Sequence, residues 1–98
     1  MSKALDDIAT ERARQISAEG WTPEHDDQHC NGEMVEAAIC YLIAAQEQRL
    51  EREPRLMLSW PWAACYWKQK DVRSNLVRGV ALAVAEIERL DRKPEQGE

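Results

Sequence analysis

The chain contains no phenylalanine, few glycines and no long apolar run, and each absence narrows the range of folds. Only four of its 98 residues are glycine, whereas 44% are hydrophobic and 32% are charged. A chain that is poor in glycine and rich in charged residues is typical of a helical domain with a solvated exterior. No apolar run reaches the roughly 20 residues that cross a bilayer, and residues 1–12 lack the apolar core of a secretion signal. We therefore expect a cytoplasmic protein without a membrane segment.

The chain also lacks an excess of basic residues and a regular cysteine pattern. Its 13 Lys and Arg are outnumbered by 18 Asp and Glu, which gives a net charge of −5. Non-specific nucleic-acid binding requires a basic face, so this charge argues against it. Cys30, Cys40 and Cys65 are odd in number and contain no Cys-x-x-Cys pair, which favours reduced thiols over a disulfide framework.

The hydrophobic pattern predicts a single all-α domain over residues 1–92, a three- or four-helix bundle, followed by a flexible tail at 93–98. The first helix is predicted over residues 3–19, with Ser2 as its N-cap and Gly20 at its end. A chain of this length buries only a modest core.

A short helical turn is predicted directly after the first helix. Thr22, Pro23 and Glu24 stand in the order of an N-cap, a first helical position and an acid beside the positive end of the helix dipole. The acidic segment that follows should therefore sit on a pre-organised turn.

The second long helix is predicted from Asn31 or Gly32 to about Arg49, with a charged end that stops before Pro54. Apolar residues occupy so much of its circumference that it should be the most buried helix. One face carries Met34, Ala38, Tyr41, Leu42 and Ala45, which Val35, Ile39, Cys40 and Ile43 broaden.

The last helix is predicted to begin near Asp71 and to pack antiparallel to the second. Its apolar positions follow one another in steps of four or three residues, as in a coiled coil: Val72, Leu76, Val80, Ala83, Ile87 and Leu90. Further apolar positions widen this face beyond what one partner helix can cover, so we expect a homo-oligomer formed through the second and last helices.

A tryptophan-rich connector joins these two helices over residues 54–70. Trp60, Trp62 and Trp67 predict either a satellite core or a recognition surface. Trp67 precedes Lys68 and Lys70, so it is the ring that we expect to stack on a ligand.

The turn at residues 24–33 has an unusual density of potential metal or proton-transfer ligands. Crowded carboxylates and imidazoles require a cation, a basic partner or solvent, although a solvated capping loop would have the same composition. Mg²⁺ is the favoured ion. The alternative is Zn²⁺, held by His25 and His29 together with either Cys30 or an aspartate of the turn. The residues predicted to bind metal are Asp26, Asp27, His29, Glu33 and Glu36.

Basic residues gather around the predicted start of the last helix, where backbone N–H groups favour anions. Either a phosphate-bearing ligand or a salt-bridge network with the acidic turn would use them. We predict that the acidic turn and the connector converge on one pocket, whose ligand-binding residues are Trp21, His25, Trp67, Lys68, Lys70 and Arg73.

Three strings of residues distinguish this chain: Glu19-Gly20-Trp21-Thr22-Pro23-Glu24-His25-Asp26-Asp27, Trp60-Pro61-Trp62 and Trp67-Lys68-Gln69-Lys70-Asp71. Through these strings most of the chain resembles a group of small proteins encoded by bacteriophages and prophages. The resemblance implies accessory work on host metabolism or host defence, for example by sequestering a nucleotide or by docking on a host defence protein.

Glu33-x-x-Glu36 opens the second long helix, and Glu88-x-x-Asp91 lies at the far end of the last helix, with Asp71 as a substitute carboxylate at the opposite end. These pairs resemble the Glu-x-x-Glu and Glu-x-x-Asp motifs with which the MazG-like all-α nucleoside triphosphate pyrophosphatases hold magnesium. This resemblance implies a magnesium-dependent nucleotide pyrophosphohydrolase as the alternative to a protein that binds a nucleotide or another phosphate-bearing ligand without turnover.

Overall fold

The computed structural model describes residues 2–92, and over these residues the chain is an all-α helical bundle without strands, as the sequence predicts. The tail predicted at 93–98 lies outside the described residues. The described part forms the helices α1 (Lys3–Glu19), α2 (Pro23–Asp27), α3 (Glu33–Arg49) and α4 (Val72–Asp91), with a 3-10 turn, η1 (Ala64–Tyr66), in the connector.

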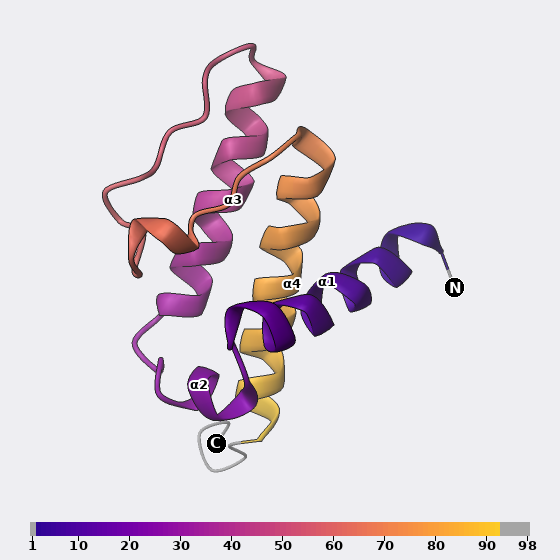
Figure 1. The fold of residues 1–98 in the computed structure, drawn as a ribbon, viewed down its shortest axis with the longest axis vertical. Helices are drawn as coiled ribbons and strands as arrows, with labels where there is room; N and C mark the ends of the chain where they lie inside the picture. The colour runs from indigo at the N-terminus through magenta and orange to yellow at the C-terminus, as the bar shows by residue number, and fades with distance from the viewer. Residues whose placement is uncertain (1, 93–98) are drawn as a thin grey trace.

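Helices α3 and α4 form the centre of the bundle. They lie side by side and run in opposite directions, while α1 packs across α4 and α2 lies near the end where α3 begins (Figure 1). Gly79 permits their close approach, because a Cβ there would lie 3.1 Å from the Ala38 carbonyl oxygen and 3.0 Å from Leu42 Cδ2. The predicted antiparallel packing is confirmed.

The helix ends follow the capping signals in the sequence. The side chains of Ser2, Thr22 and Asp71 accept hydrogen bonds from backbone N–H groups in the first turns of α1, α2 and α4. Gly20 ends α1 at φ 76°, in the left-handed region that favours glycine, and Pro23 opens α2. The predicted starts of α1 and α2 are therefore confirmed.

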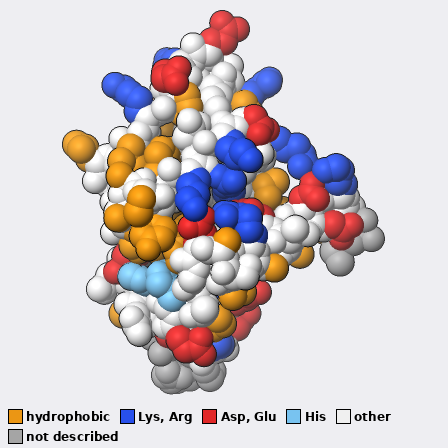
Figure 2. Space-filling model, viewed as in Figure 1, with side chains coloured by type: hydrophobic (Ala, Val, Ile, Leu, Met, Phe, Trp, Pro, Cys, Tyr) orange, Lys and Arg blue, Asp and Glu red, His pale blue; other side chains and the backbone are white. Residues whose placement is uncertain are grey.

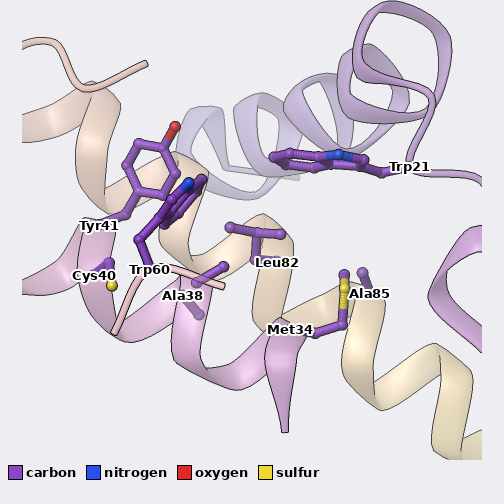
Figure 3. Close-up of a cluster of buried hydrophobic side chains, with 9 residues drawn as sticks. Trp21, Met34, Ala38, Cys40, Tyr41, Trp60, Leu82 and Ala85 are labelled. Atoms are coloured by element: carbon purple, nitrogen blue, oxygen red, sulfur yellow. The ribbon is translucent and has the colours of Figure 1, made fainter. Parts of the chain in front are cut away.

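The core lies between the α3–α4 pair and the segments that fold over it. Trp21, which follows α1, and Trp60 of the connector both lie over this pair beside Leu82 (Figure 3). The rest of the cluster comes from α3 and α4: Met34, Ala37, Ala38, Cys40, Tyr41 and Ala85. The connector therefore contributes to the main core instead of forming a separate satellite.

The predicted packing face of α4 is wrong. Leu76, Val80, Ile87 and Leu90 are exposed. The side of α4 that is buried instead carries Asn75, Gly79, Ala81, Leu82, Ala85 and Arg89. Small residues let α4 approach its neighbours closely. Asn75 is hydrogen-bonded through its amide, and Arg89 donates to Glu86 through Nε and Nη2, while its buried Nη1 has no hydrogen-bond partner among the described residues.

Hydrogen bonds tie the connector to the helices. The Tyr41 hydroxyl accepts from the Lys68 backbone N–H at 2.9 Å. Asn75, fully buried, accepts from the Lys70 N–H at 2.8 Å and donates to the Gln48 side chain at 2.9 Å. Because these polar groups are paired, the irregular segment keeps a defined position over α3.

Two further findings concern the thiols and membrane crossing. Cys30, Cys40 and Cys65 are all free thiols. Among the helices of residues 2–92, none combines the length and the apolar character needed to cross a membrane.

Candidate functional site

The acidic turn is anchored by one buried ion pair. Asp26 is fully buried, and its Oδ2 accepts from Arg12 Nη2 at 2.9 Å. Arg12 also donates to the Trp21 carbonyl at 3.1 Å and to Glu88 Oε1 at 3.2 Å. One guanidinium therefore connects α1, α2 and α4, and it satisfies a carboxylate that would otherwise be buried alone.

Asp26 also fixes the imidazole of His25. The second carboxylate oxygen, Oδ1, lies 3.0 Å from His25 Nδ1. Because an ionised carboxylate only accepts, Nδ1 must donate, and Nε2 of a neutral His25 then carries the lone pair. The His25 side chain is 26% exposed, and its ring centroid lies 4.3 Å from that of His29 and 5.7 Å from that of Trp62.

An aromatic pocket of about 350 Å³ opens where the acidic turn meets the connector. The end of α1, the start of α2 and the connector each contribute to its walls. Trp21 and Trp62 are in ring contact at 4.9 Å, and Tyr66 lies 6.5 Å from Trp21. The pocket is lined by Glu19, Gly20, Trp21, His25, Trp62, Ala63 and Tyr66.

A second, basic pocket of about 280 Å³ lies between α1 and the start of α4. Four cationic side chains face two carboxylates there, so the pocket has a positive balance in an acidic protein. Its lining consists of Asp7, Glu11, Arg14, Lys70, Arg73, Ser74, Val77 and Arg78.

Ion pairs occupy the cations of the basic pocket only in part. Arg73 pairs with Asp7 at 2.9 Å, and hydrogen bonds from Lys3 and Arg73 hold the pKa of Asp7 below its usual range. Arg78 Nε lies 3.8 Å from Glu11 Oε2, while its Nη1 is buried and has no hydrogen-bond partner among the described residues. A buried donor in this state gains from an acceptor that enters the pocket.

Glu19 joins the two pockets. Its side chain is 2% exposed and lines the aromatic pocket. Its Oε2 lies 3.1 Å from Nη1 of Arg14, a residue that lines the basic pocket, and 2.9 Å from Lys68 Nζ. Burial raises the pKa of Glu19, but hydrogen bonds from Lys68 and Arg14 outweigh this effect and keep the pKa below its usual range. Figure 2 shows Lys and Arg side chains gathered in the middle of one face, with hydrophobic and His side chains beside them.

The structure distributes the predicted ligand residues over these two pockets. Trp21 and His25 line the aromatic pocket, and Lys70 and Arg73 line the basic pocket. Lys68 reaches the wall between them through Glu19. Trp67 lines neither pocket, because its ring packs on Tyr41 at 4.7 Å and on Trp60 at 5.1 Å.

The two aspartates predicted to bind metal are held by arginines. Asp26 pairs with Arg12, and Asp27 Oδ1 lies 2.8 Å from Arg92 Nη2. Both pairs connect α2 to a longer helix or to its C-cap. The crowded carboxylates on this turn thus have basic partners within the chain.

The other predicted metal ligands lie at the start of α3. His29 Nδ1 is 3.7 Å from Glu33 Oε2, and Glu36 is half-buried in the first turn. Hydrogen bonds from the backbone N–H groups of Glu33 and Asn31 lower the pKa of Glu33. Within residues 2–92 no three His, Cys, Asp or Glu side chains are grouped to hold a metal ion. The Mg²⁺ site stays a prediction.

Sequence reasoning did not assign Glu19, Tyr66 or Arg14 to the site. Arg14 and Glu19 are five residues apart, outside the usual helical pairing distances, so their contact gave no sequence signal. Tyr66 reaches Trp21 only because the connector folds back over the bundle.

Comparison of the chain with protein-family models, with curated proteins and with solved structures gives no significant match.

Proposed function

We propose that this protein binds a small ligand that carries both a phosphate group and an aromatic ring, such as a nucleotide, across the aromatic and basic pockets. One observation carries the proposal: Glu19 is a wall of the aromatic pocket and pairs with Arg14 of the basic pocket. A single ligand could therefore reach both pockets at once, with its ring in one and its phosphate in the other.

The basic pocket suits the phosphate. Lys70 and Arg73 approach from the start of α4, where the helix dipole also favours an anion, and Arg78 approaches from the second turn of α4. Arg78 Nη1 is a buried donor without an acceptor among the described residues, and a phosphate oxygen would supply one. The chain has a net charge of −5, but the cations of this pocket outnumber its carboxylates. A phosphate dianion is therefore bound better here than in the aromatic pocket.

The aromatic pocket suits the ring. Tyr66 is 39% exposed and can offer its face to a planar group, while Trp21 is buried and gives a rigid wall. Stacking of a base on an aromatic side chain contributes about 1–3 kcal/mol. His25 Nε2, oriented by Asp26, provides a polar contact for the edge of the base.

Binding without hydrolysis is the function that this arrangement favours. A magnesium-dependent pyrophosphohydrolase requires several carboxylates that converge on the metal. Here Arg12 forms ion pairs with both Asp26 and Glu88. Glu88 is one of the carboxylates that the MazG-like resemblance would assign to magnesium. If the protein does accessory work for a phage, binding without turnover would sequester a host nucleotide signal. Alternatively, the protein would dock on a host defence protein.

Calorimetric titration with a panel of nucleotides, with and without Mg²⁺, tests the proposal, and chromatography of the titrated sample detects any hydrolysis. We expect saturable binding without turnover for at least one nucleotide. The double variant Lys70→Gln/Arg73→Gln should weaken binding at least tenfold, whereas Arg55→Gln, an exposed cation outside both pockets, should not.

Two results would count against this function. Turnover in the presence of Mg²⁺ would select the pyrophosphohydrolase instead. Equal affinity of the double variant and the wild type would remove the basic pocket from the site.

A further inference from the structure

The α3–α4 pair has an apolar surface that no part of the described chain covers. Seven large apolar side chains on it are between 36% and 57% exposed, and we call them the apolar stripe: Val35, Ile39 and Leu42 of α3 with Leu76, Val80, Ile87 and Leu90 of α4. On α4 the residues, with Ala83 between Val80 and Ile87, repeat in steps of four and three, which keeps them in line along the helix.

The two halves of the stripe lie on the same side of the helix pair. Six of the seven stripe residues directly follow a buried residue, as Val35 follows Met34 and Val80 follows Gly79, and Ile87 follows the half-buried Glu86. One residue is a rotation of about 100° around a helix axis. Because α3 and α4 are antiparallel and face each other through these buried residues, equal rotations bring both halves to one side, opposite the Trp-rich connector.

We propose that a second copy of this chain covers the apolar stripe and completes an antiparallel four-helix bundle. The repeat of three and four residues is the spacing by which helices pack in such bundles. The stripe exposes on the order of 500 Å² of apolar surface per copy, whereas a standard interface buries about 800 Å² per partner. Polar residues around the stripe can supply the rest of that buried area.

Charges at the two ends of the stripe fix the direction of the partner. Arg49, seven residues after Leu42, continues the stripe at the end where α4 begins, and Asp91, four after Ile87, continues it at the other end. In one arrangement, a twofold axis perpendicular to the helices packs α4 antiparallel on the partner's α4. The basic end of the stripe in each copy then lies against the acidic end of the stripe in the other copy. The axis parallel to the helices would instead place the basic end of one copy beside the basic end of the other, where the two Arg49 side chains repel.

Sedimentation equilibrium of the full chain tests this dimer. We expect a mass twice that of one chain at high micromolar concentration. Val80→Glu should give monomers, because the antiparallel arrangement places Val80 near the twofold axis, where two introduced carboxylates would approach each other. Leu58→Glu is the matched control: Leu58 is fully exposed on the connector, outside the stripe, and this variant should stay dimeric.

Circular dichroism of Val80→Glu shows whether this variant is still folded. Asp91→Arg tests whether the two α4 helices of the dimer run in opposite directions. We expect Val80→Glu to retain the helical signal of the wild type and Asp91→Arg to weaken the dimer at least tenfold. A wild type that is monomeric at every concentration, or a folded Val80→Glu that remains as dimeric as the wild type, would overturn the proposal. Either outcome leaves the nucleotide proposal intact, because none of the seven stripe residues lines the two pockets.

Discussion

Arg12 and Asp26 form an ion pair with a 2.9 Å contact between Nη2 and Oδ2, and their side chains are only 8% and 0% exposed. The pair lies at the point where α1, α2 and α4 meet, and the other oxygen of Asp26 orients His25. The acidic turn thus has a structural role in the bundle as well as a place in the aromatic pocket.

The first prediction concerns this ion pair. Asp26→Asn removes the charge that compensates Arg12, and we expect it to lower the free energy of unfolding by about 3–5 kcal/mol. Urea denaturation measures the loss. Glu53→Gln, which changes an exposed carboxylate, should stay within about 0.5 kcal/mol of the wild type. A loss as small as that of the control would show that the pair does not hold the turn.

The second prediction concerns the pH dependence of Glu19. Its pKa is lower in the folded chain than its ordinary value of 4.5, so its ionised form stabilises the fold above about that pH. This contribution is lost as the pH falls through the folded-state pKa. We expect Glu19→Gln to cost about 1–2 kcal/mol at pH 7, because Arg14 and Lys68 keep partial contact with solvent.

Urea unfolding of wild type and Glu19→Gln across a pH series measures this effect. The difference between them should shrink as the pH falls below 4.5. A difference that stays constant through this range would mean that the charge of Glu19 does not contribute.

The third prediction concerns Gly79. Alanine has the better helix propensity by about 1 kcal/mol, but its Cβ would lie 3.1 Å from the Ala38 carbonyl oxygen, which belongs to the backbone of α3 and cannot move freely. We expect the crowding, at about 1–3 kcal/mol, to outweigh the gain, so Gly79→Ala should lower the melting temperature. A variant more stable than the wild type would show that α3 and α4 are not in close contact there.

The fourth prediction concerns the metal. A ligand that binds the folded state raises its melting temperature, so we expect Mg²⁺, Mn²⁺ or Zn²⁺ to raise that of this protein above its value in chelator. The expected rise should depend on Glu33 and His29, which lie close together, and be lost in Glu33→Gln/His29→Gln. Asp26→Asn should instead lower the melting temperature equally with metal and with chelator. Identical melting of the wild type under both conditions would argue against any metal.

The helix ends were predictable because their signals are local. The capping side chains of Ser2, Thr22 and Asp71 act within three residues of their own position. The packing face of α4 was not predictable in this way, because apolar spacing shows which residues are hydrophobic and not which partner covers them. Asn75 is buried there because Gln48, 27 residues away in the sequence, and the nearby Lys70 satisfy its amide.

The site was predictable in composition but not in geometry. The sequence singled out His25 and Lys70, both of which line a pocket. It could not separate Trp67, which packs on Tyr41, from Tyr66 next to it, because the direction of each ring depends on how the connector folds back.

Titration of Tyr66→Ala with a nucleoside triphosphate and with inorganic triphosphate tests the two-pocket site most directly. Tyr66→Phe, which keeps the ring, is the control for both ligands. If the base stacks in the aromatic pocket while the phosphates occupy the basic pocket, Tyr66→Ala should lose about 1–3 kcal/mol of affinity for the nucleotide, and its affinity for inorganic triphosphate should not change. An equal affinity of wild type and Tyr66→Ala for the nucleotide, or an equal loss for both ligands, would contradict the account.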